Sequence, residues 1–272
     1  MHFSTQSSSV NRLRIDTDIN QAHKHPMAMV LSHYGQAEQR LSPTSDPPDD
    51  VRDTWRTWER CVVIKKHSIV KSERRADEFP RLPSGKILRP WWAQERLRNE
   101  AATLKSVAAN TTIPVPDCQL YTRDGLLHLE MARIVNGVLL LDVEPGKRAA
   151  AVRAVDNYIG SVDAALPVFP PSRIYDLDRR VWPRVSRDCD EFVLCHNDLA
   201  PQNIFVDPDT FRIVGIIDWE FAGYFPPSFE LPLWKEFERD ARKKLYDDAR
   251  PRDLGVFGFG VDDLRDDRAS SP

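Results

Sequence analysis

The 272-residue sequence predicts an α+β fold with two lobes, a small β-containing lobe followed by a larger, mainly helical lobe that carries a hairpin. The β-branched run at 62–64 is typical of a strand in the first lobe. A helix should follow it, because small and apolar residues recur at helical spacing at positions 97, 101, 104 and 108. Further along, FVLC, NIFV and RIVGII are short β-rich runs separated by Asp-Pro turn chemistry, which predicts the hairpin.

Four parts are expected along the chain. The polar start ends in SPTSDPPDDVRDT, a composition typical of unfolded or linker segments, and the stretch DDLRDDRASSP near the other end reads as a solvated tail. Between them lie the two lobes, and a chain of this length can bury a core in both. The expected parts are a poorly ordered segment 1–54, an N-lobe 55–134, a C-lobe 135–250 and a tail 251–272.

Composition excludes some partners. The formal net charge is -3, so no basic field exists to hold a nucleic acid through its phosphates. No apolar run approaches the ~20 residues that cross a bilayer, and the first residues lack the apolar core of a secretory signal. We therefore expect no nucleic-acid partner, no membrane partner and a cytoplasmic location, and we predict no protein partner.

Residues 195–203, CHNDLAPQN, place a histidine, an aspartate and an asparagine at fixed spacing between apolar segments. The pattern H-x-D-x-x-x-x-N, followed by an apolar strand and another aspartate, is a phosphoryl-transfer layout. In it Asp198 is the catalytic base or orienting group, and His196 braces the loop. Asn203 and Asp218 supply oxygen ligands that suit Mg²⁺. Each piece alone is also typical of a turn or a strand end, but their order and spacing favour the catalytic interpretation.

The motifs HNDLAPQN and IIDWEFAGYFP resemble those of the aminoglycoside phosphotransferase and choline-kinase-like superfamily, in particular fungal phosphotransferase-domain proteins. The resemblance extends upstream through NEAATLKSVAANTTIPVP and covers about 58–238. It implies a bilobal protein-kinase-like fold whose mainly helical C-lobe carries the catalytic hairpin. The N-lobe is degenerate in one respect: no glycine lies between Gly35 and Gly85, where a loop covering the nucleotide phosphates is expected.

The resemblance also implies a nucleotide site. VVIK matches the V-A-I-K strand pattern, which makes Lys65 the lysine that meets the nucleotide phosphates, with Lys66 as the alternative if the strand register slips. Glu100 would pair with that lysine, or be an exposed helix residue. The backbone of an interlobe hinge would contact the nucleobase, although apolar packing explains these residues equally well: Met131, Ala132, Arg133 and Ile134.

These observations predict a kinase that moves the γ-phosphoryl group of ATP or GTP to a hydroxyl of a small-molecule substrate with Mg²⁺. A catalytically inactive kinase-fold binding protein is the main alternative, because the phosphate-covering loop is not visible. A glycosidase in a (β/α)₈ barrel, with Glu220 as acid and Asp218 as its partner, is a more remote one. Acidic residues near the site could attract a cationic substrate, and Glu230 could brace the larger lobe.

Overall fold

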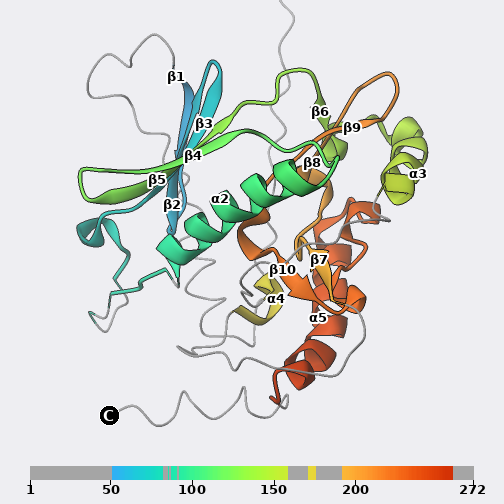
Figure 1. Ribbon diagram of the computed structural model, residues 1–272. Helices are drawn as coiled ribbons and strands as arrows, with labels where there is room; N and C mark the ends of the chain where they lie inside the picture. The colour runs from blue at the N-terminus through green and yellow to red at the C-terminus, as the bar shows by residue number, and fades with distance from the viewer. Residues whose placement is uncertain are drawn as a thin grey trace, which may run out of the picture. The chain divides into compact units, whose positions relative to one another are not determined.

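The computed structural model describes residues 51–81, 85, 87–90, 92–158, 171–175 and 192–259. Most of the predicted N-terminal segment, the stretch before the hairpin and the end of the tail lie outside these residues. The helices and strands, which Figure 1 labels, are β1 Val51–Arg56, β2 Arg60–Lys65, β3 Ser68–Glu73, α2 Ala93–Asn110, β4 Cys118–Arg123, β5 Leu126–Ala132, β6 Val138–Leu139, α3 Arg148–Tyr158, α4 Ser172–Tyr175, β7 Val193–Cys195, β8 Ile204–Val206, β9 Ile213–Ile216, β10 Gly223–Phe225 and α5 Arg239–Val256.

The N-lobe is a five-stranded antiparallel sheet in the order β1-β2-β3-β5-β4. Strand β2 lies between β1 and β3, with Val62 opposite Trp55 on one side and opposite Lys71 on the other. Valine and isoleucine are frequent in β2 and β3, and their branched side chains suit a pleated surface. Strand β1 begins at Val51, so the first four residues of this strand were wrongly assigned to the irregular segment 1–54. The prolines and aspartates just before Val51 are typical of an irregular segment, so the sequence does not indicate where the strand starts.

Helix α2 packs on this sheet through a face that includes Leu97, Leu104 and Val107, all of which are buried. Leu129 and Met131 of β5 are buried in the same cluster. The helix ends at Asn110, after which the Thr111 hydroxyl donates to the Val107 carbonyl at 2.8 Å. The extended, proline-containing segment that follows cannot continue the helix. The predicted helix and its end are confirmed.

The C-lobe contains short strands among helices and 3₁₀ turns (Figure 1). Strand β7 pairs with β10, and β8 lies between β6 and β9, all antiparallel. Of the segments predicted to form the hairpin, NIFV and RIVGII give β8 and β9, with the 195–203 motif entering β8, whereas FVLC gives β7 in the separate pair with β10. Helix α5 runs through Pro251 to Val256, beyond the expected C-lobe end at 250.

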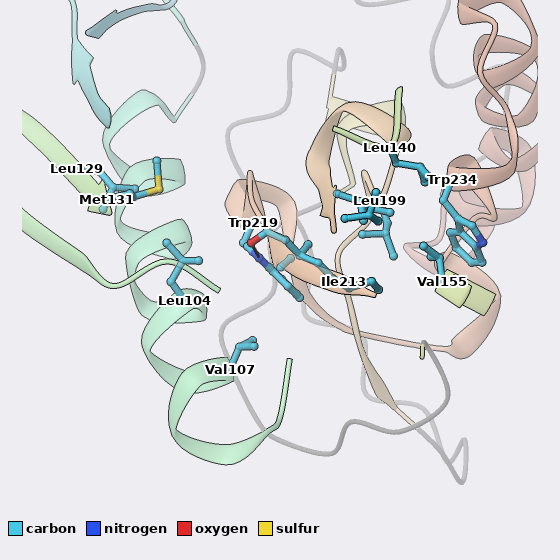
Figure 2. Packing of buried hydrophobic residues seen from close by; sticks show 14 of the residues in the cluster. Leu104, Val107, Leu129, Met131, Leu140, Val155, Leu199, Ile213, Trp219 and Trp234 are labelled. Carbon is cyan, nitrogen blue, oxygen red and sulfur yellow. Dashed lines mark hydrogen bonds between the residues drawn. The ribbon is translucent and has the colours of Figure 1, made fainter. Parts of the chain in front are cut away.

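One apolar cluster joins the helix and sheet of the first lobe to the strands of the second (Figure 2). Trp219 follows β9 and is 3% exposed, and it belongs to the same cluster as Leu104. Burying a large apolar side chain contributes about 1.5–3 kcal/mol. The segment after Asp218 is therefore fixed by packing against both lobes.

The glycosidase alternative is wrong. A (β/α)₈ barrel needs parallel strands, whereas every strand pairing within the described residues is antiparallel. Among the same residues, no helix combines the length and the apolar character needed to cross a membrane.

Candidate active site

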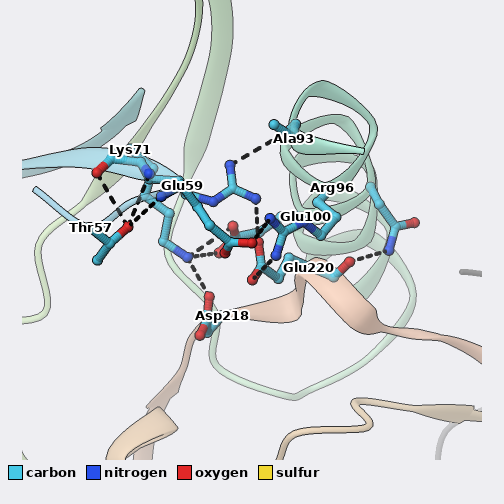
Figure 3. Close-up of polar contacts among 10 residues, drawn as sticks. Thr57, Glu59, Lys71, Ala93, Arg96, Glu100, Asp218 and Glu220 are labelled. Carbon is cyan, nitrogen blue, oxygen red and sulfur yellow. Dashed lines mark hydrogen bonds and ion pairs between the residues drawn. The ribbon is translucent and has the colours of Figure 1, made fainter. Parts of the chain in front are cut away.

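Lys71 of β3 lies at the centre of the polar site between the lobes (Figure 3). Its ammonium group contacts both carboxylate oxygens of Glu100, at 2.7 and 2.9 Å, and Oδ1 of Asp218 at 2.5 Å. Burial works against the charge of Lys71, but the carboxylates of Asp218 and Glu100 outweigh it and raise the lysine pKa. One cation therefore connects a strand, helix α2 and the segment after β9.

The charge state of this trio follows from the same contacts. Glu100 is fully buried, and burial raises its pKa against the opposing effect of Lys71. Burial also acts to raise the pKa of Asp218, but the nearby Lys71 ammonium prevails and lowers it. Asp218 is 33% exposed in its side chain, so its carboxylate remains accessible to a bound cation.

The prediction that Lys65 pairs with Glu100 is wrong. The Lys65 ammonium lies 2.9 Å from Glu130, and about 30% of its side chain is exposed. Lys71 is opposite Val62 across the sheet, and Lys65 stands three positions from Val62, so strand alternation points the two lysines to opposite faces. The alternative Lys66 follows β2 in the turn before β3, outside both strands. Glu100 itself takes the predicted kind of partner, a strand lysine.

The loop at 195–203 is held by a half-buried glutamate. Glu230 accepts hydrogen bonds from the backbone N–H groups of His196 and Asn197, as expected of a residue that braces this lobe. Asn197 has a left-handed backbone with φ of 65°, and its side chain donates to the Phe221 carbonyl at 2.9 Å. Asparagine tolerates this conformation better than most residues do. The loop is therefore tied to the segment after Asp218.

His196 is buried and positions Asp198. Its Nε2 lies 2.9 Å from the Ile217 carbonyl, and its Nδ1 is 3.3 Å from the Asp198 backbone nitrogen. These two contacts assign the proton to Nε2 and leave Nδ1 as an acceptor. Burial lowers the pKa of His196 to about 4, so the ring is neutral near pH 7. A neutral, hydrogen-bonded ring is a brace rather than a proton carrier.

Asp198 and Asn203 lie side by side. The Asn203 amide nitrogen donates to the Asp198 backbone carbonyl at 2.8 Å and approaches Oδ2 at 3.4 Å. The hydroxyl of Tyr246 donates to the other oxygen, Oδ1. Burial raises the pKa of Asp198 to about 7, although the hydrogen bond from Tyr246 opposes the shift. A carboxyl group with a pKa near 7 is suited to accept a proton at neutral pH.

Asp218 follows the end of β9 by two residues and has a left-handed backbone, φ 69°. The preceding Ile217 donates its N–H to the Asn203 carbonyl at 3.0 Å, which joins the two predicted metal-ligand positions through the backbone. The amide nitrogen of Asn203 is committed to Asp198, so its amide oxygen is the donor left for a cation. A carboxylate and an amide oxygen are ligands that Mg²⁺ accepts, and the residues present fit that ion.

The residues of the predicted hinge, 131–134, are engaged in packing and in backbone hydrogen bonds within the protein. Met131 is 4% exposed and belongs to the core, as the packing alternative expected. The backbone N–H of Ala132 donates to Asp117 and that of Arg133 to His67, both at 2.8 Å. Ile134 packs against Gly215, where an added Cβ would meet its Cδ1 at 2.2 Å. Two backbone donors expected to face a nucleobase are thus already used by the protein, and nucleobase binding here stays a prediction.

Two arginines surround Glu220, which follows Asp218 by two positions. Arg60 of β2 pairs with one carboxylate oxygen and Arg96 of α2 with the other, the latter at 3.3 Å (Figure 3). Arg96 also pairs with Glu59 at 3.0 Å. One oxygen each of Glu100, Asp218 and Glu220 lies within 4.8 Å of the others, so these cations offset a concentrated negative charge.

Sequence reasoning missed Lys71, the pairing of Arg60 with Glu220, and Tyr246. Lys71 had a signal, because SIVK repeats the apolar-apolar-lysine ending of VVIK six residues later. Arg60 and Tyr246 had no such local signal. Arg60 lies 160 positions from its partner Glu220 in the sequence, and Tyr246 lies 48 positions from its partner Asp198.

One comparison with known proteins agrees with the motifs of the C-lobe. Residues 144–253 match the sequence profile described as the phosphotransferase enzyme family. A search of curated proteins finds no match. Similar solved structures include the aminoglycoside phosphotransferase APH(3'')-Id from Streptomyces rimosus, at 17% identity and a TM-score of 0.47, covering 76% of this chain and 86% of that one.

Two others are an aminoglycoside-3'-phosphotransferase of type VIII and a thermostable mutant of APH(4)-Ia in a ternary complex with ADP and hygromycin B. The first has 18% identity and a TM-score of 0.41, over 79% of this chain and 92% of that one. The second has 16% identity and a TM-score of 0.42, over 84% and 86%. Residues 144–253 are thus similar to the phosphotransferase enzyme family, the kind of family that the hairpin motifs predicted.

Proposed function

We propose that this protein transfers the γ-phosphoryl group of a nucleoside triphosphate to a hydroxyl group of a small molecule. The observation that carries the proposal is the position of Lys71, whose ammonium contacts Glu100 and Asp218 together. A lysine fixed by a helix glutamate, beside a carboxylate that binds metal, is the arrangement that phosphoryl transfer requires of the nucleotide side.

On the nucleotide side, Lys71 binds phosphate oxygens and Glu100 holds its ammonium in place. Asn203 and Asp218 would hold Mg²⁺, which neutralises phosphate charge when bound. Because Lys71 touches Asp218 directly, both groups lie where the triphosphate has to bind. ATP and GTP are both compatible with these contacts.

On the acceptor side, Asp198 orients the attacking hydroxyl and accepts its proton. Its pKa of about 7 keeps a substantial fraction ionised at neutral pH. His196, neutral and buried, fixes the Asp198 backbone, and Asn203 fixes its carbonyl. The protein contributes mainly by positioning these groups, since the transferred phosphoryl needs little covalent chemistry from the enzyme.

The test is calorimetric binding of MgATP and MgGTP to the wild type, Lys71→Ala and Lys65→Ala. Lys71→Ala should weaken nucleotide binding by at least 10-fold, because a charge-assisted phosphate contact contributes about 1.5–3 kcal/mol. Lys65→Ala is the matched control, a strand lysine with a carboxylate partner on the opposite face of the sheet. Equal weakening by both variants, or no nucleotide binding by the wild type, would overturn the proposal.

A second candidate is a kinase-fold protein that binds a nucleotide and transfers nothing. The observation that favours it is the turn between β1 and β2, residues 57–59, which contains no glycine. Single-turnover incubation with the γ-labelled nucleotide and a panel of alcohols separates the two. If the nucleotide loses its label in the wild type but not in Asp198→Ala, the result supports the enzyme. Binding without any transfer or hydrolysis supports the binding protein.

A further inference from the structure

The turn at 57–59 uses its own backbone amides. The hydroxyl oxygen of Thr57 accepts the N–H groups of Glu59, at 3.2 Å, and Arg60, at 3.0 Å. The N–H of Thr57 itself donates to the Arg60 carbonyl at 2.9 Å. In a glycine-rich phosphate loop, backbone N–H groups of this kind bind the phosphate oxygens. Here three of them are engaged within the turn, so another donor is needed to cover the phosphates.

Arg60 stands next to this turn on the face of the sheet that carries Lys71. Lys71 is opposite Val62, and Arg60 precedes Val62 by two positions, so strand alternation places Arg60 and Lys71 on the same face. Arg60 is 6% exposed, and its guanidinium donates to Glu220 and, at 3.4 Å, to the Ala93 carbonyl. Glu220 in turn lies close to Asp218, since one carboxylate oxygen each of Glu100, Asp218 and Glu220 lies within 4.8 Å of the others. The guanidinium is therefore within electrostatic reach of the metal-ligand candidate.

Glu220 does not depend on Arg60 alone. Arg96 donates to the other oxygen of the Glu220 carboxylate, and the side chain of Asn99 donates to the Glu220 backbone carbonyl at 3.1 Å. If Arg60 turned away, Glu220 would keep a cationic partner and its backbone anchor. Leaving a buried charge unpaired is costly, and this arrangement avoids that cost.

We propose that Arg60 is a phosphate-binding residue, whose guanidinium exchanges Glu220 for the triphosphate of the bound nucleotide and replaces the backbone amides of a glycine-rich loop. The planar guanidinium presents paired donors that match phosphate oxygens. The inference rests on the proposed function, because it requires the nucleotide to bind between Lys71 and Asp218.

The experiment is calorimetric titration of Arg60→Ala, Arg60→Lys and Glu220→Gln with whichever of MgATP and MgGTP binds the wild type more tightly, and with its unphosphorylated nucleoside. Arg60→Ala should weaken nucleotide binding by about 10- to 100-fold and leave nucleoside binding unchanged. Arg60→Lys should recover part of the lost affinity, since it keeps the positive charge without the paired donors of the guanidinium. Glu220→Gln should tighten nucleotide binding, because Arg60 loses the competing anion.

The matched control is Arg56→Ala, which removes an arginine from the neighbouring strand together with its 2.9 Å pair with Glu78. It should not change nucleotide affinity. If Arg60 only braces the fold, Arg60→Ala and Glu220→Gln should weaken nucleotide and nucleoside binding alike, which would overturn the inference. If Arg60→Ala does not fold, Arg60→Lys and Glu220→Gln decide: a loss for the first with a gain for the second supports the inference, and any other pair of results overturns it.

The two proposals fail in different ways. A wild type that binds neither nucleotide removes the proposed function, and the role of Arg60 with it. If the wild type binds nucleotide, and Lys71→Ala loses that binding while Arg60→Ala keeps it, the proposed function stands. The role of Arg60 alone is then removed.

Discussion

The phenolic hydroxyl of Tyr246, on helix α5, donates a hydrogen bond to Oδ1 of Asp198. An acceptor alcohol would have to donate to the same carboxylate in order to pass its proton to it. In the proposed reaction Tyr246 therefore stands on the acceptor side of the site, and Lys71 stands on the nucleotide side. The hydrogen bond from Tyr246 also stabilises the ionised form of Asp198. It therefore partly opposes the rise in the carboxyl pKa that burial causes.

The pH dependence of catalysis should report Asp198. Its carboxyl has a pKa raised to about 7 by burial, and only the ionised form can accept a proton. We expect kcat/KM for MgATP turnover to rise with pH through about 7 and then level off. The measurement is a profile from pH 5 to 9 on the wild type and on Asp198→Asn. A wild-type profile that falls through this range would contradict the assignment of Asp198 as base.

Tyr246→Phe should move this rising limb to higher pH. Removing a hydrogen bond from the charged form raises the carboxyl pKa, and a bond of about 0.5–1.5 kcal/mol corresponds to a loss of roughly 2- to 10-fold in rate well below the limb. The control is Tyr158→Phe at the end of α3. It removes the 2.6 Å hydrogen bond that the Tyr158 hydroxyl donates to the Thr112 carbonyl. Identical profiles for the wild type and Tyr246→Phe would show that the contact does not act on the base.

Asp253→Asn should strongly destabilise the C-lobe. Arg173 of α4 pairs with Asp253 of α5, and both side chains are fully buried. The substitution leaves the arginine charge without its ionised partner, which costs about 3–5 kcal/mol in the free energy of unfolding. Urea denaturation measures the loss. Lys243→Ala, which breaks the exposed pair with Asp247 on the same helix, should change the midpoint little.

Gly215→Ala should destabilise the contact between β9 and the predicted hinge. An added Cβ would lie 2.2 Å from Cδ1 of Ile134 and 3.2 Å from its Cγ1, so the isoleucine must move. Overpacking of this kind costs about 1–3 kcal/mol. Ile134→Val removes Cδ1, and the double variant should recover part of the lost stability in thermal unfolding. A double variant no more stable than Gly215→Ala would show that the strain is not relieved at Ile134.

The local part of the site could be predicted from sequence, and the part assembled by tertiary contacts could not. His196, Asp198 and Asn203 lie within eight consecutive residues, so their spacing alone indicated a loop that meets the strand before Asp218. Lys65 and Lys71 both end β-branched apolar runs, and periodicity within a strand does not say which strand lies next to α2. The pairing of Glu100 depends on that choice.

The fold shows the same division. Helix α2 was predicted with its end, because the apolar spacing and the proline that follows are local signals. Strand β1 was not, because its residues are stabilised by pairing with β2 and follow a cluster that suggests an irregular chain. Similarly, the C-lobe was expected to end at 250, whereas α5 continues to Val256, and Asp253 and Leu254 in this last part of the helix are buried.

The hydrogen bonds from Ile217 to Asn203 and from Asn197 to Phe221 join the catalytic loop to the segment that carries Asp218. Arg60 and Tyr246 take no part in these two bonds, since one belongs to β2 and the other to α5. The loop and this segment are thus joined by bonds of their own, and Arg60 and Tyr246 reach them from opposite lobes, Arg60 through Glu220 and Tyr246 through Asp198. If the proposed function holds, substitutions at 60 and at 246 can therefore be combined to change nucleotide affinity and the protonation of Asp198 independently.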